Sequence, residues 1–96
     1  MESIQSRART LIDKAGIDRL VRHGEISHSR WQSVRYKDIR MSTEELEVLQ
    51  SLFPHYRLWL ISGEVMPEAG QVSPDFEEAS RNLAGQNAGA HHHHHH

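Results

Sequence analysis

Side chains suited to hydrogen bonding with a nucleic acid are concentrated in one short stretch of the chain. The only large apolar residues between positions 28 and 35 are Trp31 and Val34, which lie three residues apart. Helical spacing puts these two on one face, against the core, and leaves the polar side chains on the other. A helix of this kind can project into the major groove of DNA, which is about 12 Å wide. The polar side chains expected to face the bases are His28, Ser29, Gln32, Ser33 and Arg35.

These groups have the chemistry that base edges and phosphates require. A glutamine amide can form two hydrogen bonds with adenine, and an arginine guanidinium can form two with guanine. Cationic groups near DNA neutralise phosphates and release counterions, so positive side chains that frame the stretch are expected to contact the backbone. The candidate phosphate contacts, including one hydroxyl, are Arg19, Arg22, Ser27, Arg30, Lys37 and Arg40.

Several polar and aromatic residues of the chain allow other interpretations. Trp31 could stack on a base, although its spacing favours the core, and Arg7 and Arg9 are interpreted as solvated charges on a helix. His23 and His28 are separated by a helix break, and the chain has no cysteine, so neither a zinc site nor a thiol nucleophile is expected. Nothing groups serine, histidine and aspartate into a catalytic triad. We therefore expect no enzyme activity, no cofactor and no metal.

Charged residues are divided unevenly along the chain. Residues 1–40 hold nine Lys and Arg against five Asp and Glu, a net charge of +4. Residues 41–96 hold two against eight, a net charge of −6. Because phosphates repel acidic groups, this asymmetry indicates a basic binding face joined to an acidic body or tail that points away from DNA. A solvated surface with unevenly scattered charges is the alternative.

The elements that would position these side chains are five short helices. Apolar residues recur at helical spacing over residues 4–15, 18–23, 27–36, 42–53 and 54–63. Glycines at positions 16, 24 and 63 are suited to end helices. Ser27 is a good cap for the third helix, and Ser42-Thr43-Glu44-Glu45 matches a capping box for the fourth.

The expected fold class is all-α. No alternating strand pattern, internal repeat, signal peptide or membrane-spanning apolar run is present in the sequence, so a single cytoplasmic domain is expected. Residues 1–64 should form the helical domain. Residues 65–90 should form a short C-terminal extension, with a helix at 75–84 and a disordered end at 85–90. Residues 91–96 are a histidine purification tag.

Two groups of motifs resemble a known family. The sequence Gly24-Glu25-Ile26-Ser27, leading into Ser29-Arg30-Trp31, is similar to a glycine turn, serine cap and recognition-helix tryptophan. Ser42-Thr43-Glu44-Glu45-Leu46 and Leu58-Trp59-Leu60-Ile61-Ser62-Gly63 are similar to the closing helices of the same domain. Through these motifs the chain resembles the Cro/cI (lambda-repressor-like, Xre-type) helix-turn-helix regulators, in particular short prophage-type members. Its turn is one residue longer than the common pattern, with Glu25 inserted.

This resemblance implies a compact five-helix DNA-binding domain in which residues 18–23 cross the backbone and residues 27–36 form the recognition helix. It also implies a bacterial or prophage transcriptional regulator, expected to repress, that binds a partly palindromic operator in double-stranded DNA as a homodimer. Since the acidic half should point away from DNA, the residues expected at the dimer interface are Trp59, Phe76 and Leu83. The alternative is a protein-interaction adaptor or antitoxin-like module whose C-terminal segment folds on a protein partner.

Overall fold

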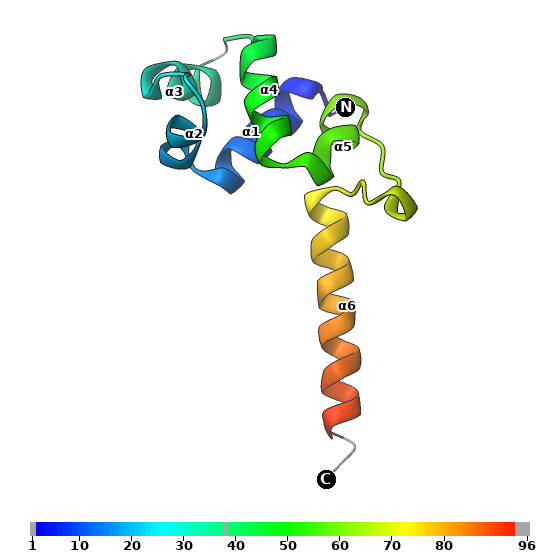
Figure 1. The fold of residues 1–96 in the computed structure, drawn as a ribbon. Coiled ribbons are helices and arrows are strands. Elements are labelled where there is room, and N and C mark those ends of the chain that lie inside the picture. Colours follow the sequence, from blue (N-terminus) through cyan, green and yellow to red (C-terminus); the bar gives the residue numbers. More distant parts are fainter. Residues whose placement is uncertain (1, 38, 94–96) are drawn as a thin grey trace.

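The computed structural model describes residues 2–37 and 39–93, with side chains described up to residue 83. Within these residues the chain consists of helices joined by short loops, and no strand is present (Figure 1). The all-α prediction is therefore confirmed for the described residues. The α-helices are α1 (Ile4–Ala15), α2 (Ile17–His23), α3 (His28–Tyr36), α4 (Thr43–Leu52), α5 (Arg57–Ser62) and α6 (Pro74–His93), and the 3-10 helices are η1 (Pro54–Tyr56) and η2 (Pro67–Ala69).

Helices α1 to α5 begin and end close to the positions that the sequence predicts, because their capping signals are local. The Ser27 hydroxyl accepts a hydrogen bond from the Arg30 N–H at 3.1 Å and so satisfies a free amide in the first turn of α3. At the start of α4, the Glu45 carboxylate accepts from the Ser42 N–H at 2.9 Å, as the capping box requires. Gly63 ends α5 in the left-handed conformation, with φ of 80°.

The core is formed by apolar side chains from α1 to α5 and η1. Trp31 and Tyr56 are the largest fully buried residues, and the rings of Tyr56 and Trp59 lie edge to face with centroids 6.3 Å apart. Trp31 and Val34 have no exposed surface, which confirms that they form the inward face of α3. The buried apolar residues are Ala8, Leu11, Ile12, Leu20, Trp31, Val34, Leu49, Phe53, Tyr56, Trp59 and Leu60.

Arg7 departs from the expected packing. The sequence predicts a solvated charge at this position, yet Arg7 is only 6% exposed. Its Nε donates to the Leu60 carbonyl at 3.0 Å and its Nη2 donates to the Ile61 carbonyl at 3.2 Å. Carbonyls in the last turn of a helix lack helical partners, so Arg7 satisfies two such groups of α5 and ties α1 to α5.

The C-terminal region differs most from the expected five-helix domain with a short tail. Residues 66–73 fold back onto the body: the Gln71 side chain accepts from the Leu58 N–H at 2.9 Å, and the Val72 N–H donates to the His55 carbonyl at 2.9 Å. These bonds hold Gln71 and Val72 against α5 and η1. A sixth α-helix, α6, follows and includes both the expected helix at 75–84 and residues 85–90, which were expected to be disordered.

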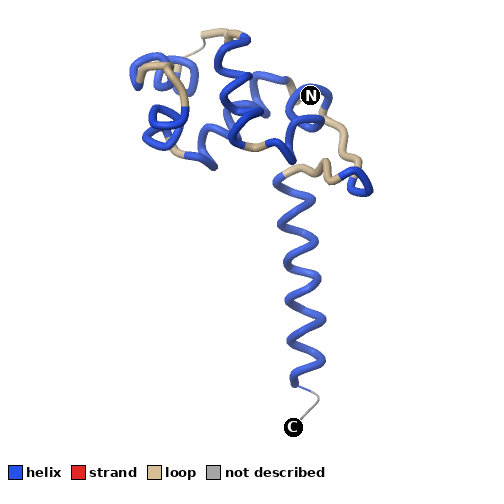
Figure 2. The backbone as a smooth tube through the Cα atoms, in the orientation of Figure 1, coloured by secondary structure: helices blue, strands red, loops and turns tan. Residues whose placement is uncertain are grey.

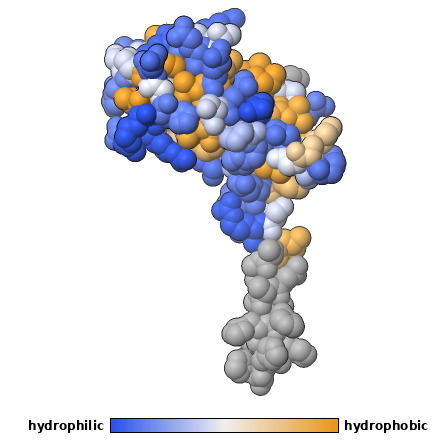
Figure 3. All heavy atoms as spheres, in the orientation of Figure 1, coloured by the Kyte–Doolittle hydropathy of each residue, from blue (hydrophilic) through white to orange (hydrophobic). Residues whose placement is uncertain are grey.

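The overall shape is a small helical body from which one long helix projects (Figure 2). Its principal extents are 54 × 25 × 23 Å. The visible surface of the body is mainly hydrophilic and is broken by apolar patches (Figure 3). Among the described residues, no helix combines the length and the apolar character needed to cross a membrane.

Candidate nucleic-acid interface

Helices α2 and α3 pack against each other at one end of the body and are joined by residues 24–27 (Figure 1). Leu20 of α2 and Trp31 of α3 are both fully buried, so each helix is fixed to the common core. Gly24 ends α2 with an extended backbone, at φ of −130°, and not in the left-handed conformation. A Cβ atom at this position would lie 2.9 Å from Cγ2 of Val48, so glycine is required by the close approach of the turn to α4.

The outward face of α3 carries side chains that the sequence predicts for base contacts. Ser29 and Gln32 are exposed and Ser33 is half-buried. At about 100° per residue, these three project from the side of the helix opposite Trp31 and Val34. No hydrogen bond occupies their side chains within the part of the chain that the structure describes. Their hydroxyl and amide groups are therefore available to a ligand.

Tyr36 belongs to the same face, although it is not among the contact residues that the sequence predicts. Its side chain is 69% exposed, more than any other large apolar or aromatic residue described. It lies seven residues after Ser29 and four after Gln32, the spacing of side chains on one helical face. This spacing was the signal that could have identified it.

A carboxylate lies beside the N-terminal end of this face. His28 begins α3, and its Nε2 is 3.9 Å from Oδ1 of Asp18 on α2, with both side chains largely exposed. Asp18 is not among the residues that the sequence predicts at this face. Because a carboxylate repels phosphates, Asp18 makes this end of the face less favourable for a phosphate ligand.

Arg35 is held by a second carboxylate, Asp13 on α1. Its Nε and Nη2 donate to the two carboxylate oxygens of Asp13, at 2.5 and 2.8 Å, which is the two-pronged geometry of a strong ion pair. The hydrogen bonds to Asp13 raise the pKa of Arg35 above its ordinary value. The structure thus directs the donors of Arg35 toward α1, whereas the sequence predicts that they contact a base.

Arg30 is likewise turned inward. Its Nη2 donates to Oε1 of Glu45 at 2.9 Å and to the Arg40 carbonyl at 3.2 Å. Burial tends to raise the pKa of Glu45, but the hydrogen bonds from Arg30 and Ser42 outweigh burial and lower it. Arg30 therefore joins α3 to α4 and to the segment between them, whereas the sequence predicts a phosphate contact.

The remaining predicted phosphate contacts differ in their exposure and in whether their side chains have partners within the protein. Arg19, Arg22 and Lys37 are exposed and form no ion pair within the described residues. The Arg19 guanidinium lies 5.8 Å from the centre of the Phe53 ring, at the end of α4. The Ser27 hydroxyl is engaged as the cap of α3. Exposed positive charge therefore remains on α2 and on the residues that follow α3.

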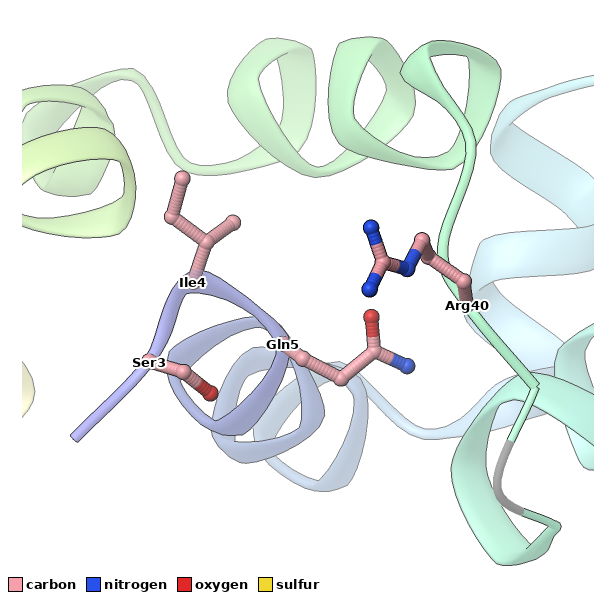
Figure 4. A pocket seen from close by; sticks show the side chains of 4 residues that line it. All are labelled: Ser3, Ile4, Gln5 and Arg40. Atoms are coloured by element: carbon pink, nitrogen blue, oxygen red, sulfur yellow. The ribbon is translucent and has the colours of Figure 1, made fainter. Parts of the chain in front are cut away.

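Arg40 borders a cavity of about 570 Å³ between the start of α1 and the segment that links α3 to α4 (Figure 4). The Arg40 guanidinium and the Gln5 amide point toward each other across it (Figure 4). Gln5 also donates to the Ile39 carbonyl at 2.7 Å and accepts from the Met41 N–H at 2.9 Å. These two bonds fix the backbone on either side of Arg40. The cavity is lined by Ser3, Ile4, Gln5 and Arg40.

Acidic side chains gather at a second cavity, of about 310 Å³, between the α2–α3 turn and α4. His23 and Ser51 share a hydrogen bond of 3.1 Å at this cavity. Within the described residues, no group of three or more His, Asp and Glu is arranged to hold a metal ion. The acids of α4 therefore lie next to the turn that joins α2 to α3. The lining residues are His23, Glu25, Ile26, Glu44, Glu47, Val48 and Ser51.

The three residues expected at a dimer interface lie in different environments. Trp59 is only 8% exposed, so it belongs to the core and is not available to a second chain. Phe76 and Leu83 lie on α6 and are exposed. The start of α6 is held to the body by the Tyr56 hydroxyl, which donates to Glu77 at 2.5 Å. Burial, and then the nearby Glu77 carboxylate, raise the pKa of Tyr56 well above its ordinary value.

Neither the models of known protein families nor the sequences of curated proteins match this chain. The functional interpretation therefore depends on the placement of α2 and α3 and on the chemistry of the side chains that they expose.

Proposed function

We propose that the chain is a sequence-specific regulator of transcription that binds the major groove of double-stranded DNA with α3. The observation that supports this most directly is the outward face of α3, which exposes Ser29, Gln32 and Tyr36 while Trp31 and Val34 anchor the helix in the core. A polar helix anchored on one side and open on the other can enter a groove about 12 Å wide. The resemblance to the Cro/cI regulators supports the same function.

The exposed groups divide into those suited to bases and those suited to phosphates. The Gln32 amide suits adenine, and Ser29, Ser33 and His28 can hydrogen bond to base edges at neighbouring positions. Arg30 and Arg35 have internal partners and are assigned to holding α3 in place. The cations suited to phosphates are Arg19, Arg22, Lys37 and Arg40.

The proposed regulator acts as a dimer, with the exposed Phe76 and Leu83 of α6 at the contact between its two chains. Its two-fold symmetry would place the half-sites of a partly palindromic operator about 10–10.5 bp apart, or a multiple of that spacing. Occupation of such an operator would repress by blocking the promoter.

Selection from a random pool of DNA duplexes tests this function. At about 150 mM salt nonspecific attraction to phosphates is weakened, so enrichment requires base recognition. We expect an enriched inverted repeat. Weak, salt-sensitive binding with no enriched sequence would contradict specific recognition.

Two substitutions in the protein, each measured for binding to the selected DNA, should separate base contacts from phosphate contacts. Gln32→Ala should lose about 1–3 kcal/mol of discrimination at one base position, because a two-pronged contact is removed. Arg22→Ala should weaken binding to all sequences alike and reduce the salt slope by about 1. Both residues are exposed, so circular dichroism should show an intact fold. Unchanged binding by both variants would show that this face is not the interface.

A protein-interaction adaptor is the second candidate function. The observation that favours it is α6, which leaves the body and exposes Phe76 and Leu83. Removal of residues 74–90 separates the two functions, since residues 66–73 remain bonded to the body. DNA recognition should then survive at the affinity of a monomer, whereas binding to a protein partner through α6 should be lost.

A further inference from the structure

Three side chains near the C-terminal end of α3 form a connected arrangement. The Asp13 carboxylate on α1 holds the Arg35 guanidinium through two hydrogen bonds. The Arg35 guanidinium in turn lies over the Tyr36 ring, with its central carbon 4.9 Å from the ring centre. A guanidinium within about 6 Å of a ring centre is attracted to it. Asp13 therefore restrains the Tyr36 ring through Arg35.

The packing of the core gives no reason for this arrangement. Tyr36 is the last residue of α3 and stays 69% exposed, so its ring contributes little buried surface. The charge of Arg35 is balanced by Asp13, which makes Arg35 a weak candidate for a phosphate contact. What the arrangement does achieve is a fixed position for an exposed phenol hydroxyl on the outward face of α3.

We propose that Tyr36 contacts DNA and that Asp13 and Arg35 are the residues that position it. The inference rests on the proposed function and adds a specific contact to it. Tyr36 follows Ser29 by seven residues, or about 10 Å along the helix axis. If Ser29 and Gln32 meet base edges inside a groove about 12 Å wide, Tyr36 reaches the sugar–phosphate backbone at its edge. Its hydroxyl then donates a hydrogen bond to a phosphate oxygen, a contact that tyrosine commonly makes.

Tyr36→Phe tests the contact itself. The variant keeps the ring that Arg35 covers and removes only the hydroxyl, so the fold and the position of α3 should not change. A lost hydrogen bond to a charged oxygen should weaken binding about tenfold. Because phosphates carry no sequence information, the loss should be equal for the selected operator and for its single-base variants. Gln32→Ala is the matched control, since its loss should depend on sequence.

Asp13→Asn tests the positioning role, because the loss of a negative charge and the loss of a restraint on Tyr36 should change DNA binding in opposite directions. Removal of an acid near DNA should strengthen binding if only charge matters. Loss of the Asp13 contact should release Arg35 and Tyr36 and weaken binding several-fold if position matters. Asp18→Asn is the control: it removes the same charge beside the same face, does not touch Arg35, and should strengthen binding.

A measurement without DNA makes the result independent of the proposed function. In the free protein, the Nε–H of Arg35 should exchange slowly with solvent in NMR spectra, and Asp13→Asn should make this exchange fast. Rapid exchange in the parent chain, or an Asp13→Asn variant that binds DNA more tightly as Asp18→Asn does, would overturn the positioning role. Equal binding by Tyr36→Phe and the parent would overturn the contact alone. A parent chain that binds no duplex would overturn the proposed function and the contact together.

Discussion

Glu45, at the start of α4, is a charged residue that is only 2% exposed to solvent. Its carboxylate accepts from Arg30 and from the Ser42 N–H, each at 2.9 Å. A buried carboxylate without such partners would be costly, so the partners are needed for the charged form to persist. Through Glu45, the cap of one helix becomes the anchor of the proposed recognition helix.

The charge of Glu45 should make the free energy of unfolding depend on pH. Its partners lower its pKa in the folded chain below the ordinary value of 4.5, so the folded state binds this proton less readily than the unfolded state. The stabilisation is then present above about pH 4.5 and is lost as the pH falls through the folded pKa. Glu45→Gln should lower the free energy of unfolding by about 1–2 kcal/mol at neutral pH and reduce its decline in acid.

Urea unfolding followed by tryptophan fluorescence between about pH 3 and 7 provides the measurement. Glu47→Gln is the control. Glu47 is exposed on the same helix, so its substitution should leave the dependence of stability on pH nearly unchanged. An unaltered acid profile in Glu45→Gln would show that other carboxylates cause the decline.

Some residues of the candidate interface could be predicted from the sequence and others could not. The exposure of Ser29 and Gln32 and the burial of Trp31 follow from helical periodicity, which is a local property. Arg30 and Arg35 were expected to contact DNA, yet their partners lie 15 and 22 residues away. No local pattern identifies such partners, because only the packing of α1 and α4 against α3 brings them together.

At the scale of elements, two glycines that both end helices do so for different physical reasons. Gly16 has φ of +85°, and beyond its own helix backbone and chain neighbours no part of the protein lies within 4 Å of where its Cβ would be. Gly24 has a backbone conformation that any residue can adopt, but its Cβ would lie 2.9 Å from Cγ2 of Val48. Backbone conformation therefore requires glycine at position 16, and the approach of α4 requires it at position 24.

Gly24→Ala should therefore be destabilising, and a second substitution should relieve it. The extra methyl group should force α4 away from the turn and cost about 1–3 kcal/mol of unfolding free energy. Val48→Ala removes the opposing methyl groups, so the double variant should lose less than the sum of the single losses. Gly16→Ala with Val48→Ala is the control pair and should be additive. Additive losses at position 24 would exclude the steric explanation.

The ends of a helix could be predicted only where signals within a few residues mark them. Ser27, the Ser42 capping box and Gly63 mark helix ends through bonds within a few residues, and these ends were predicted closely. The length of α6 was not predicted, because Gly85, Asn87 and Gly89 have weak helix propensity. The hydrogen bonds of Arg7 to the last turn of α5 could not be predicted, because Arg7 and Leu60 are 53 residues apart in the sequence.

For the whole molecule, α6 determines the shape. It is 20 residues long, or about 30 Å, and projects from the body of a molecule whose principal extents are 54 × 25 × 23 Å (Figure 1). Tyr56 and Ser73 fix its start, through the bond to Glu77 and through the cap on the Phe76 N–H. A helix that leaves the body with apolar residues exposed is expected to gain stability by packing on another surface.

Pairing of two chains through α6 should therefore depend on one face of this helix. Phe76 and Leu83 are seven residues apart and lie on the same face, and Leu83 is 61% exposed. Leu83→Glu should shift the chain toward the monomer in sedimentation experiments over a range of concentrations, because it puts a charge into the apolar contact. Asn82→Glu adds the same charge on a neighbouring face and should leave the dimer intact. If neither variant changes the mass, the two chains do not meet through this face, and α6 is free for another partner. If both variants change the mass, the contact does not depend on this face alone.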